Sequence, residues 1–255
     1  MFGELYAEDP VRAEQAARVN ARLIAAELSA CGVDVDCLPL LDVRQDGAHD
    51  VIGDRAFAYT PEIVSRLGRA QSEGLAAGGV APVMKHIPGH GRAGVDSHHA
   101  LPRVDTALTE LTAIDFAPFK ALRDLPMAMT AHVIYETLDP ERVATVSPRI
   151  IDEIIRAEIG FDGLLMSDDI SMKALEISTA RALEAGCDVV LHCNGDMAEM
   201  QMVAGAAPAL SGSALARAEA VLGFLDRIRR DSRPMPFEEL LASFAELTGT
   251  SQAAT

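Results

Sequence analysis

The segment VAPVMKHIPGHG, residues 80–91, begins as an apolar run and ends in Lys85 and His86, before a turn rich in glycine and proline. Apolar runs of this length are typical of strands that are buried on both faces of a parallel sheet. Comparable runs cover residues 35–43, 127–135, 161–169 and 187–195. Helical patterns precede them at residues 10–32, 61–77, 109–122 and 147–159, with a shorter one at 177–186 and an alanine-rich tail. This alternation predicts an α/β fold.

Nearly every apolar run ends in polar or titratable side chains. In a (β/α) barrel the C-terminal ends of all strands meet at one mouth, whereas an open sheet gathers its ligand contacts at a single switch point. The pattern therefore favours a TIM-barrel type of fold. Only about five strand candidates are present, whereas such a barrel closes with eight. We expect an incomplete barrel over residues 1–230, followed by a C-terminal helix and tail over 231–255. The polar residues at the run ends are Asp42, Lys85, His86, His132, Asp168, Asp169, His192 and Asn194.

The composition narrows the range of partners. The chain has 255 residues, of which 49% are hydrophobic, and a formal charge of −16. This charge argues against binding to nucleic acid or to an anionic membrane. Widely spaced cysteines, no CxxC motif and no apolar leader or membrane-length run predict a cytoplasmic protein with reduced thiols. Neither GxGxxG nor GxxxxGK[ST] occurs, so we expect no nucleotide cofactor.

Four motifs, "VIGDRAF", "KHIPGHG", "DSHHALP" and "MSDDISMKAL", together resemble the β-N-acetylhexosaminidases of glycoside hydrolase family 3, the NagZ type. The resemblance extends from about Phe2 to Leu225. It implies a cytoplasmic TIM-barrel enzyme without a cofactor that releases terminal β-linked N-acetylglucosamine from muropeptides during peptidoglycan recycling. Members of this family carry additional residues before the equivalent of Phe2, which supply the remaining three or so strands of the barrel and a "DQEGG" motif.

The resemblance also implies catalytic residues. A retaining glycosidase needs a carboxylate nucleophile and a group that protonates the leaving oxygen. The first aspartate of the "SDD" motif is Asp168, the implied nucleophile. The implied proton donor is the dyad of Asp96 and His98, in which imidazole can both give and take a proton near neutrality. Because side chains alternate along a strand, Asp169 is expected to be a cap or a hydrogen-bond acceptor.

The same resemblance assigns Arg55, Lys85 and His86 to the binding of the sugar, and it implies no metal. From the residues alone, His90 is as compatible with bracing the turn as with touching substrate. His132 and His192 are expected to be core imidazoles.

Two other functions stay open. One is a metal-dependent hydrolase in which His86, His90, Asp96 and His98 bind zinc, although their spacing matches no common zinc motif. The other is a catalytically impaired barrel remnant that serves as a binding or assembly partner. An incomplete barrel would expose unpaired strand edges and its apolar interior, which predicts poor solubility or dependence on a partner.

Overall fold

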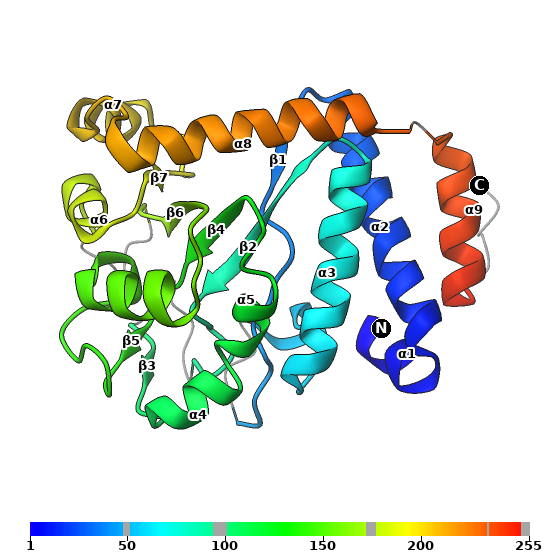
Figure 1. Cartoon of the computed structure of the whole chain (residues 1–255), viewed down its shortest axis with the longest axis horizontal. Coiled ribbons are helices and arrows are strands. Elements are labelled where there is room, and N and C mark those ends of the chain that lie inside the picture. Colours follow the sequence, from blue (N-terminus) through cyan, green and yellow to red (C-terminus); the bar gives the residue numbers. More distant parts are fainter. Residues whose placement is uncertain (48–51, 94–100, 172–176, 234, 251–255) are drawn as a thin grey trace.

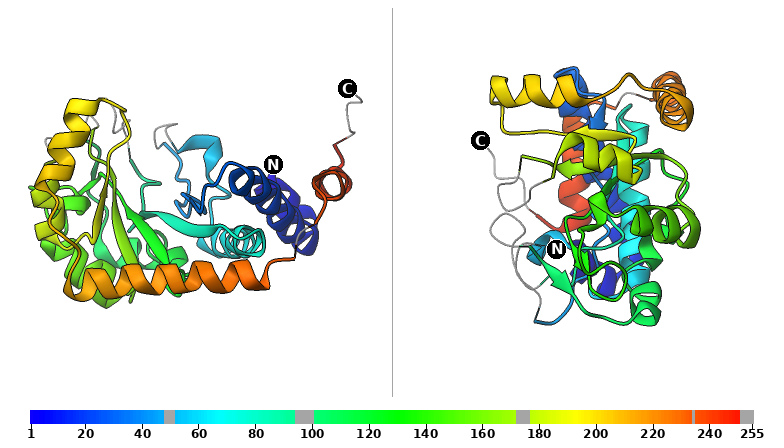
Figure 2. Two further views of the ribbon diagram at one scale, coloured as in Figure 1. Left: turned by 90° about the horizontal axis from the view of Figure 1, so that it is seen from above. Right: turned by 90° about the vertical axis from the view of Figure 1, so that its left-hand side faces the viewer.

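The computed structural model describes residues 1–47, 52–93, 101–171, 177–233 and 235–250. Its main feature is a five-stranded parallel sheet that curls into a half-barrel (Figures 1 and 2). The chain therefore has the expected α/β architecture of an incomplete TIM barrel. The strand order is β1 (Val35–Asp36), β2 (Ala81–Ile87), β4 (Met127–Thr130), β6 (Leu164–Asp169) and β7 (Val189–Leu191). A separate parallel pair is formed by β3 (Arg103–Val104) and β5 (Ile134–Tyr135).

Helices separate the strands, largely where the sequence predicts them. Helix α2 (Pro10–Ala30) begins after Asp9, whose side chain accepts the backbone N–H of Arg12 at 3.1 Å, and α3 (Pro61–Ala77) has the expected bounds. The last helix packs on the first two: Arg12 Nε of the second helix donates to the carbonyl of Leu247 at 2.6 Å, and the ring of Phe2, in the first helix, lies 6.4 Å from that of Phe244. The helices are α1 (Phe2–Glu8), α2 (Pro10–Ala30), η1 (Gly53–Arg55), α3 (Pro61–Ala77), α4 (Leu108–Ala113), α5 (Ala117–Ala121), η2 (Ala144–Val146), η3 (Ile150–Glu158), α6 (Thr179–Ala185), α7 (Met197–Ala206), α8 (Gly212–Asp231) and α9 (Phe237–Thr248).

Two predicted elements are interrupted. The helix predicted over 109–122 is divided into α4 and α5, and Pro118 lies in the first turn of α5. Proline lacks the N–H that a continuous helix needs at this point, so the break has a signal in the sequence. The strand predicted over 127–135 leaves the main sheet after Thr130, and Ile134 pairs with Arg103 instead. The strand predicted over 35–43 is reduced to β1 and an isolated bridge between Leu40 and Lys85.

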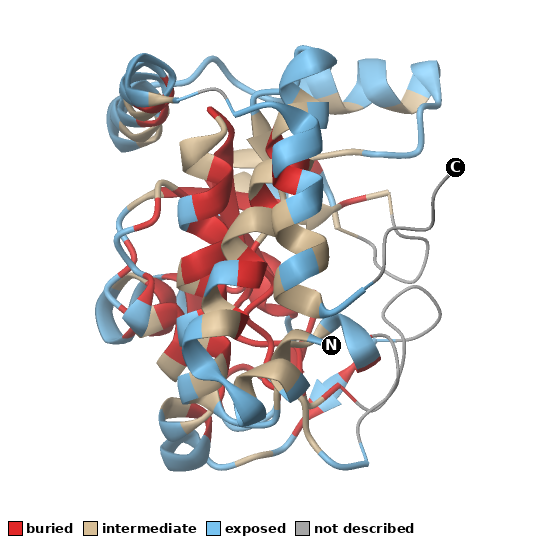
Figure 3. Cartoon of the chain, turned by 90° about the vertical axis from the view of Figure 1, so that its right-hand side faces the viewer, coloured by how far each residue is buried: buried red, intermediate tan, exposed pale blue. Residues whose placement is uncertain are grey.

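The two faces of the sheet have different coverings. Met84, Ala128 and Leu165 point to the outer face, where α3, α5 and η3 contribute side chains such as Phe119 and Ile155 to the largest core cluster. Buried residues concentrate on the strands and on the helix sides that face them (Figure 3). Because outer helices cover this face, the opposite one would line the interior of a closed barrel.

Helix α8 covers the N-terminal half of that interior face. It contributes Val221, Leu225 and Ile228 to a second core cluster with strand residues. The expectation that this apolar face is exposed is therefore wrong for its N-terminal half. The strand residues of the cluster are Ala81, Val83, Met127, Met129, Leu164 and Met166.

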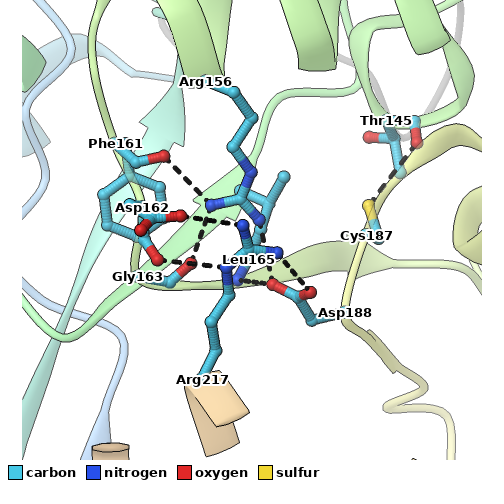
Figure 4. Close-up of polar contacts among 9 residues, drawn as sticks. All are labelled: Thr145, Arg156, Phe161, Asp162, Gly163, Leu165, Cys187, Asp188 and Arg217. Carbon is cyan, nitrogen blue, oxygen red and sulfur yellow. Dashed lines mark hydrogen bonds and ion pairs between the residues drawn. The ribbon is translucent and has the colours of Figure 1, made fainter. Parts of the chain in front are cut away.

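Charged hydrogen bonds fix α8 at the N-terminal ends of the strands (Figure 4). Asp188, just before β7, accepts hydrogen bonds from Arg156 at 2.9 Å, from Arg217 at 3.0 Å and from the backbone N–H of Leu165 at 2.8 Å. Arg217 of α8 also donates to Asp162 at 2.8 Å. The carboxylate of Asp188 is buried and shared by η3, β6 and α8, so it ties three elements together. None of the described helices combines the length and the apolarity needed to cross a membrane.

Candidate functional site

The C-terminal ends of β2 and β6 bring Lys85, His86 and Asp168 together. Lys85 and Asp168 follow Val83 and Met166 on the interior face, as strand alternation requires. His86 would alternate to the outer face, but the register of β2 against β4 shifts between Lys85 and Ile87. A shift of this kind re-aims side chains. As a result, the Nε2 atom of His86 lies 3.9 Å from Oδ2 of Asp168.

The surroundings of Asp168 favour its ionised form. Burial alone would raise the pKa of this carboxyl, but the imidazoles of His86 and His132, the N–H of Asp169 and the charge of Lys85 together lower it below its ordinary value. Its Oδ1 atom accepts the Asp169 N–H at 2.8 Å, and its side chain keeps 21% exposure. An ionised, partly accessible carboxylate meets the requirement for a nucleophile.

A fully buried carboxylate, Asp42, supports the imidazole of His86. Oδ2 of Asp42 lies 2.7 Å from Nδ1 of His86, and Oδ1 accepts the backbone N–H groups of His86 at 3.3 Å and of His90 at 2.7 Å. Burial would raise the pKa of Asp42, but the nearby His86 and the hydrogen bonds outweigh it and lower the pKa. Asp42 is recognisable in the sequence only as a polar residue at a strand end, because its partner is 44 positions away.

Further contacts hold the loop that follows β2. Tyr135 donates its hydroxyl to the carbonyl of Gly89, and Arg92 Nε donates to buried Asp115 at 2.7 Å. A Cβ atom at Gly91 would lie 1.9 Å from the carbonyl oxygen of Val43, so glycine is required there. The loop is thus fixed by side chains from several elements.

The other candidate residues at the strand ends have structural partners. Asp169 accepts the N–H groups of Ser171 and Cys193, both at 3.0 Å, which is the acceptor role expected for it. His132 is buried and uses both ring nitrogens, on Thr145 Oγ1 at 2.7 Å and the Asp169 carbonyl at 3.1 Å. His192 lies 3.2 Å from Glu199.

His90 is a buried, neutral imidazole. Burial and the neighbouring His86 lower its pKa to about 4, and its Nδ1 atom has no hydrogen-bond partner in the described part of the chain. Its backbone N–H rather than its ring contacts Asp42. The geometry thus supports the bracing role for His90.

The remaining predicted site residues are Arg55, Asp96 and His98. Arg55 lies in η1 and lines a pocket of 260 Å³ with Leu38 and Gln71. Within the described ranges no hydrogen bond or ion pair connects it with Lys85, His86 or Asp168. Asp96 and His98 lie outside the described residues. No group of three metal-ligating side chains occurs among the described residues, but the zinc hypothesis includes Asp96 and His98 and is not tested by this finding.

Comparison with known families identifies the fold. Residues 6–221 match the glycosyl hydrolase family 3 N-terminal domain. The chain belongs to glycosyl hydrolase family 3. Among family 3 relatives, a beta-hexosaminidase of Bordetella avium is 40% identical over 237 residues, which cover 90% of this chain and 64% of that protein. A beta-hexosaminidase of Alkalilimnicola ehrlichii is 44% identical over 202 residues, 76% of this chain and 58% of the relative. The chain thus spans about three fifths of the length of these relatives.

Solved family 3 structures have a similar fold. NagZ from Neisseria gonorrhoeae, in complex with N-trifluoroacetyl-D-glucosamine, superposes with a TM-score of 0.81 at 34% identity, covering 96% of this chain and 74% of NagZ. A structure of NagZ in complex with zinc ion matches with the same TM-score. Both matches extend over 96% of this chain.

Proposed function

We propose that the protein is a retaining β-N-acetylhexosaminidase that removes terminal β-linked N-acetylglucosamine. The observation that carries the proposal is the ionised Asp168 at the end of β6, with His86 3.9 Å away and Lys85 close enough to lower its pKa. The relatives named beta-hexosaminidase and the glucosamine derivative bound to NagZ support the same substrate class.

In the proposed reaction, Asp168 attacks the anomeric carbon while the leaving oxygen takes a proton. His98, oriented by Asp96, supplies that proton and later removes one from the attacking water. Lys85 and His86 hold sugar hydroxyls beside the nucleophile, and Arg55 contributes from its own loop. By resemblance of the motifs, we further propose that the natural substrates are muropeptides released in peptidoglycan recycling, and that the protein acts in the cytoplasm.

A decisive experiment targets the nucleophile. Asp168→Ala is expected to lower turnover of an aryl β-N-acetylglucosaminide by about 10³-fold or more, as loss of a covalent catalyst does. A fluorinated glycoside whose second step is slow should leave an adduct on the peptide that contains Asp168 and none in the variant. Asp169→Asn is the matched control, because it removes the neighbouring charge. Retention of more than a few per cent of the activity in Asp168→Ala would place the nucleophile elsewhere.

A second function is favoured by the open sheet. The described strands end at two edges, β1 and β7. We propose as the alternative that a family 3 domain with this open sheet binds the sugar or a partner chain without turning over substrate. Measurable affinity for N-acetylglucosamine with no hydrolysis, by the chain and by Asp168→Ala alike, would support this alternative over the enzyme.

A further inference from the structure

Asp42 is completely buried, and its bonding constrains a ring that lies beside Asp168. Each of the two carboxylate oxygens already has a partner. An ionised carboxylate is only an acceptor. The nitrogen 2.7 Å away, Nδ1 of His86, must therefore carry a hydrogen.

We propose that Asp42 is a positioning residue that holds His86 in the tautomer with hydrogen on Nδ1 and so fixes what its Nε2 atom presents to the sugar. Whenever the ring is uncharged, Nε2 in this tautomer is an acceptor with a free lone pair. The 3.9 Å between Nε2 and Asp168 is too long for a hydrogen bond, so this lone pair is available for a ligand. The part of the inference that concerns sugar binding rests on the proposed function, whereas the tautomer does not.

The specificity that follows is for a hydroxyl that donates. A sugar hydroxyl directed at Nε2 can donate to the lone pair, while a methoxy group or a hydrogen at the same carbon cannot. Sites that bond a hydroxyl in this way discriminate strongly against analogues that lack it. Without Asp42 the ring would be free to place its hydrogen on Nε2 and to present a donor instead.

The competing explanation is that Asp42 only braces the loop through the N–H groups of His86 and His90. Asp42→Asn separates the two roles. The Oδ1 atom of asparagine can still accept both backbone N–H groups, but its amide nitrogen donates, so Nδ1 of His86 must become the acceptor and Nε2 must carry the hydrogen. Asp115→Asn is the matched control, since Asp115 is another buried carboxylate that supports the same loop, through Arg92 rather than an imidazole.

The test is long-range ¹H–¹⁵N correlation NMR on protein labelled in histidine, with the His86 signals assigned through His86→Gln. We expect the Nδ1–H form in the wild type and in Asp115→Asn, and the Nε2–H form in Asp42→Asn. Titration with N-acetylglucosamine should show binding weakened by about tenfold or more in Asp42→Asn, the typical cost of one mismatched buried hydrogen bond.

Each outcome decides between the roles. An Nε2–H ring in the wild type overturns the proposal, and this spectrum suffices even if Asp42→Asn fails to fold. Weaker sugar binding with an unchanged tautomer in Asp42→Asn also overturns it in favour of the brace. A tautomer that changes as expected in a protein that binds no sugar supports the positioning role and counts against the proposed function instead.

Discussion

Asp168 and Asp188 occupy opposite ends of the same sheet, and their surroundings differ in kind. Asp188, before β7, is bonded by two arginines and a backbone N–H, and its side chain is 4% exposed. Asp168, at the end of β6, has one backbone N–H and imidazoles at longer range, and is 21% exposed. The first carboxylate has its bonding capacity filled by the protein, whereas the second retains capacity for a ligand.

This difference agrees with the general rule for barrels, in which catalytic residues lie at the C-terminal ends of the strands and residues that stabilise the fold lie at the N-terminal ends. The comparison shows that the role of a buried carboxylate depends on how many of its hydrogen-bonding positions the protein leaves unfilled. Asp188 has more charged partners than Asp168, yet its own carboxylate has no oxygen left for a substrate.

Besides the loss of the nucleophile, the largest effect is expected from loss of the proposed proton donor. His98→Ala should lower turnover of a substrate with a poor leaving group by about 10²–10⁴-fold, and turnover of an activated phenyl glycoside by less, because a good leaving group needs little protonation. Steady-state rates on the two substrates measure this, and thermal unfolding should be nearly unchanged. Equal losses on both substrates would show that His98 only positions the sugar.

Asp188→Asn should show the reverse behaviour at the N-terminal ends. Removing this charge leaves Arg156 and Arg217 partly buried beside a neutral amide, which typically costs about 3–5 kcal/mol in the free energy of unfolding. Urea denaturation measures the loss. Asp168→Asn is the paired variant, with an expected loss below about 1 kcal/mol. If both variants lose the same stability, the contrast between the two ends is wrong.

The docking of α8 on the interior face gives a smaller effect. Leu225 is 6% exposed in the cluster with the strands, so Leu225→Ala should cost about 2–3 kcal/mol. Leu222, on the same helix, is 62% exposed, and Leu222→Ala should change stability by less than about 0.5 kcal/mol. Denaturation curves of the pair test the packing directly, and equal curves would mean that α8 does not cover the face.

The pH dependence of stability should be the smallest effect, because two groups oppose each other. Burial raises the pKa of Asp115 from 3.8 to about 6, so its folded form binds more protons and its contribution falls as pH rises from about 4 to 6. The pKa of His90 is lowered from 6.5 to about 4, so its contribution rises over nearly the same range.

Asp115→Asn removes the first of these contributions. Its unfolding free energy should therefore increase with pH between about 4 and 6.5 more steeply than that of the wild type. Urea midpoints at several pH values provide the measurement, and a slope equal to that of the wild type would show that Asp115 does not titrate in this range.

The sequence predicts best those features that depend on local pattern. The apolar runs of β2 and β6 and the bounds of α3 are visible without the structure, and Pro118 marks the break that the prediction over 109–122 overlooks. The partnership of Asp42 with His86 and the shift of register after Lys85 depend on contacts between distant segments. The docking of α8 is equally non-local, because an alanine-rich helix carries no sign of which face of a sheet it will meet.

The alternation of faces along β2 up to Lys85 limits which mutations of the gene are tolerated. Deletion of a single codon anywhere between Ala81 and Met84 would slide the strand by one position and exchange its faces. Lys85 would then turn into the layer of outer helices, and His86 would take its place on the interior face. Substitution of one apolar residue by another of similar size at these positions keeps the faces of the strand, whereas loss of one residue does not. Relatives that keep this site should therefore differ in residue type along β2 but not in its length.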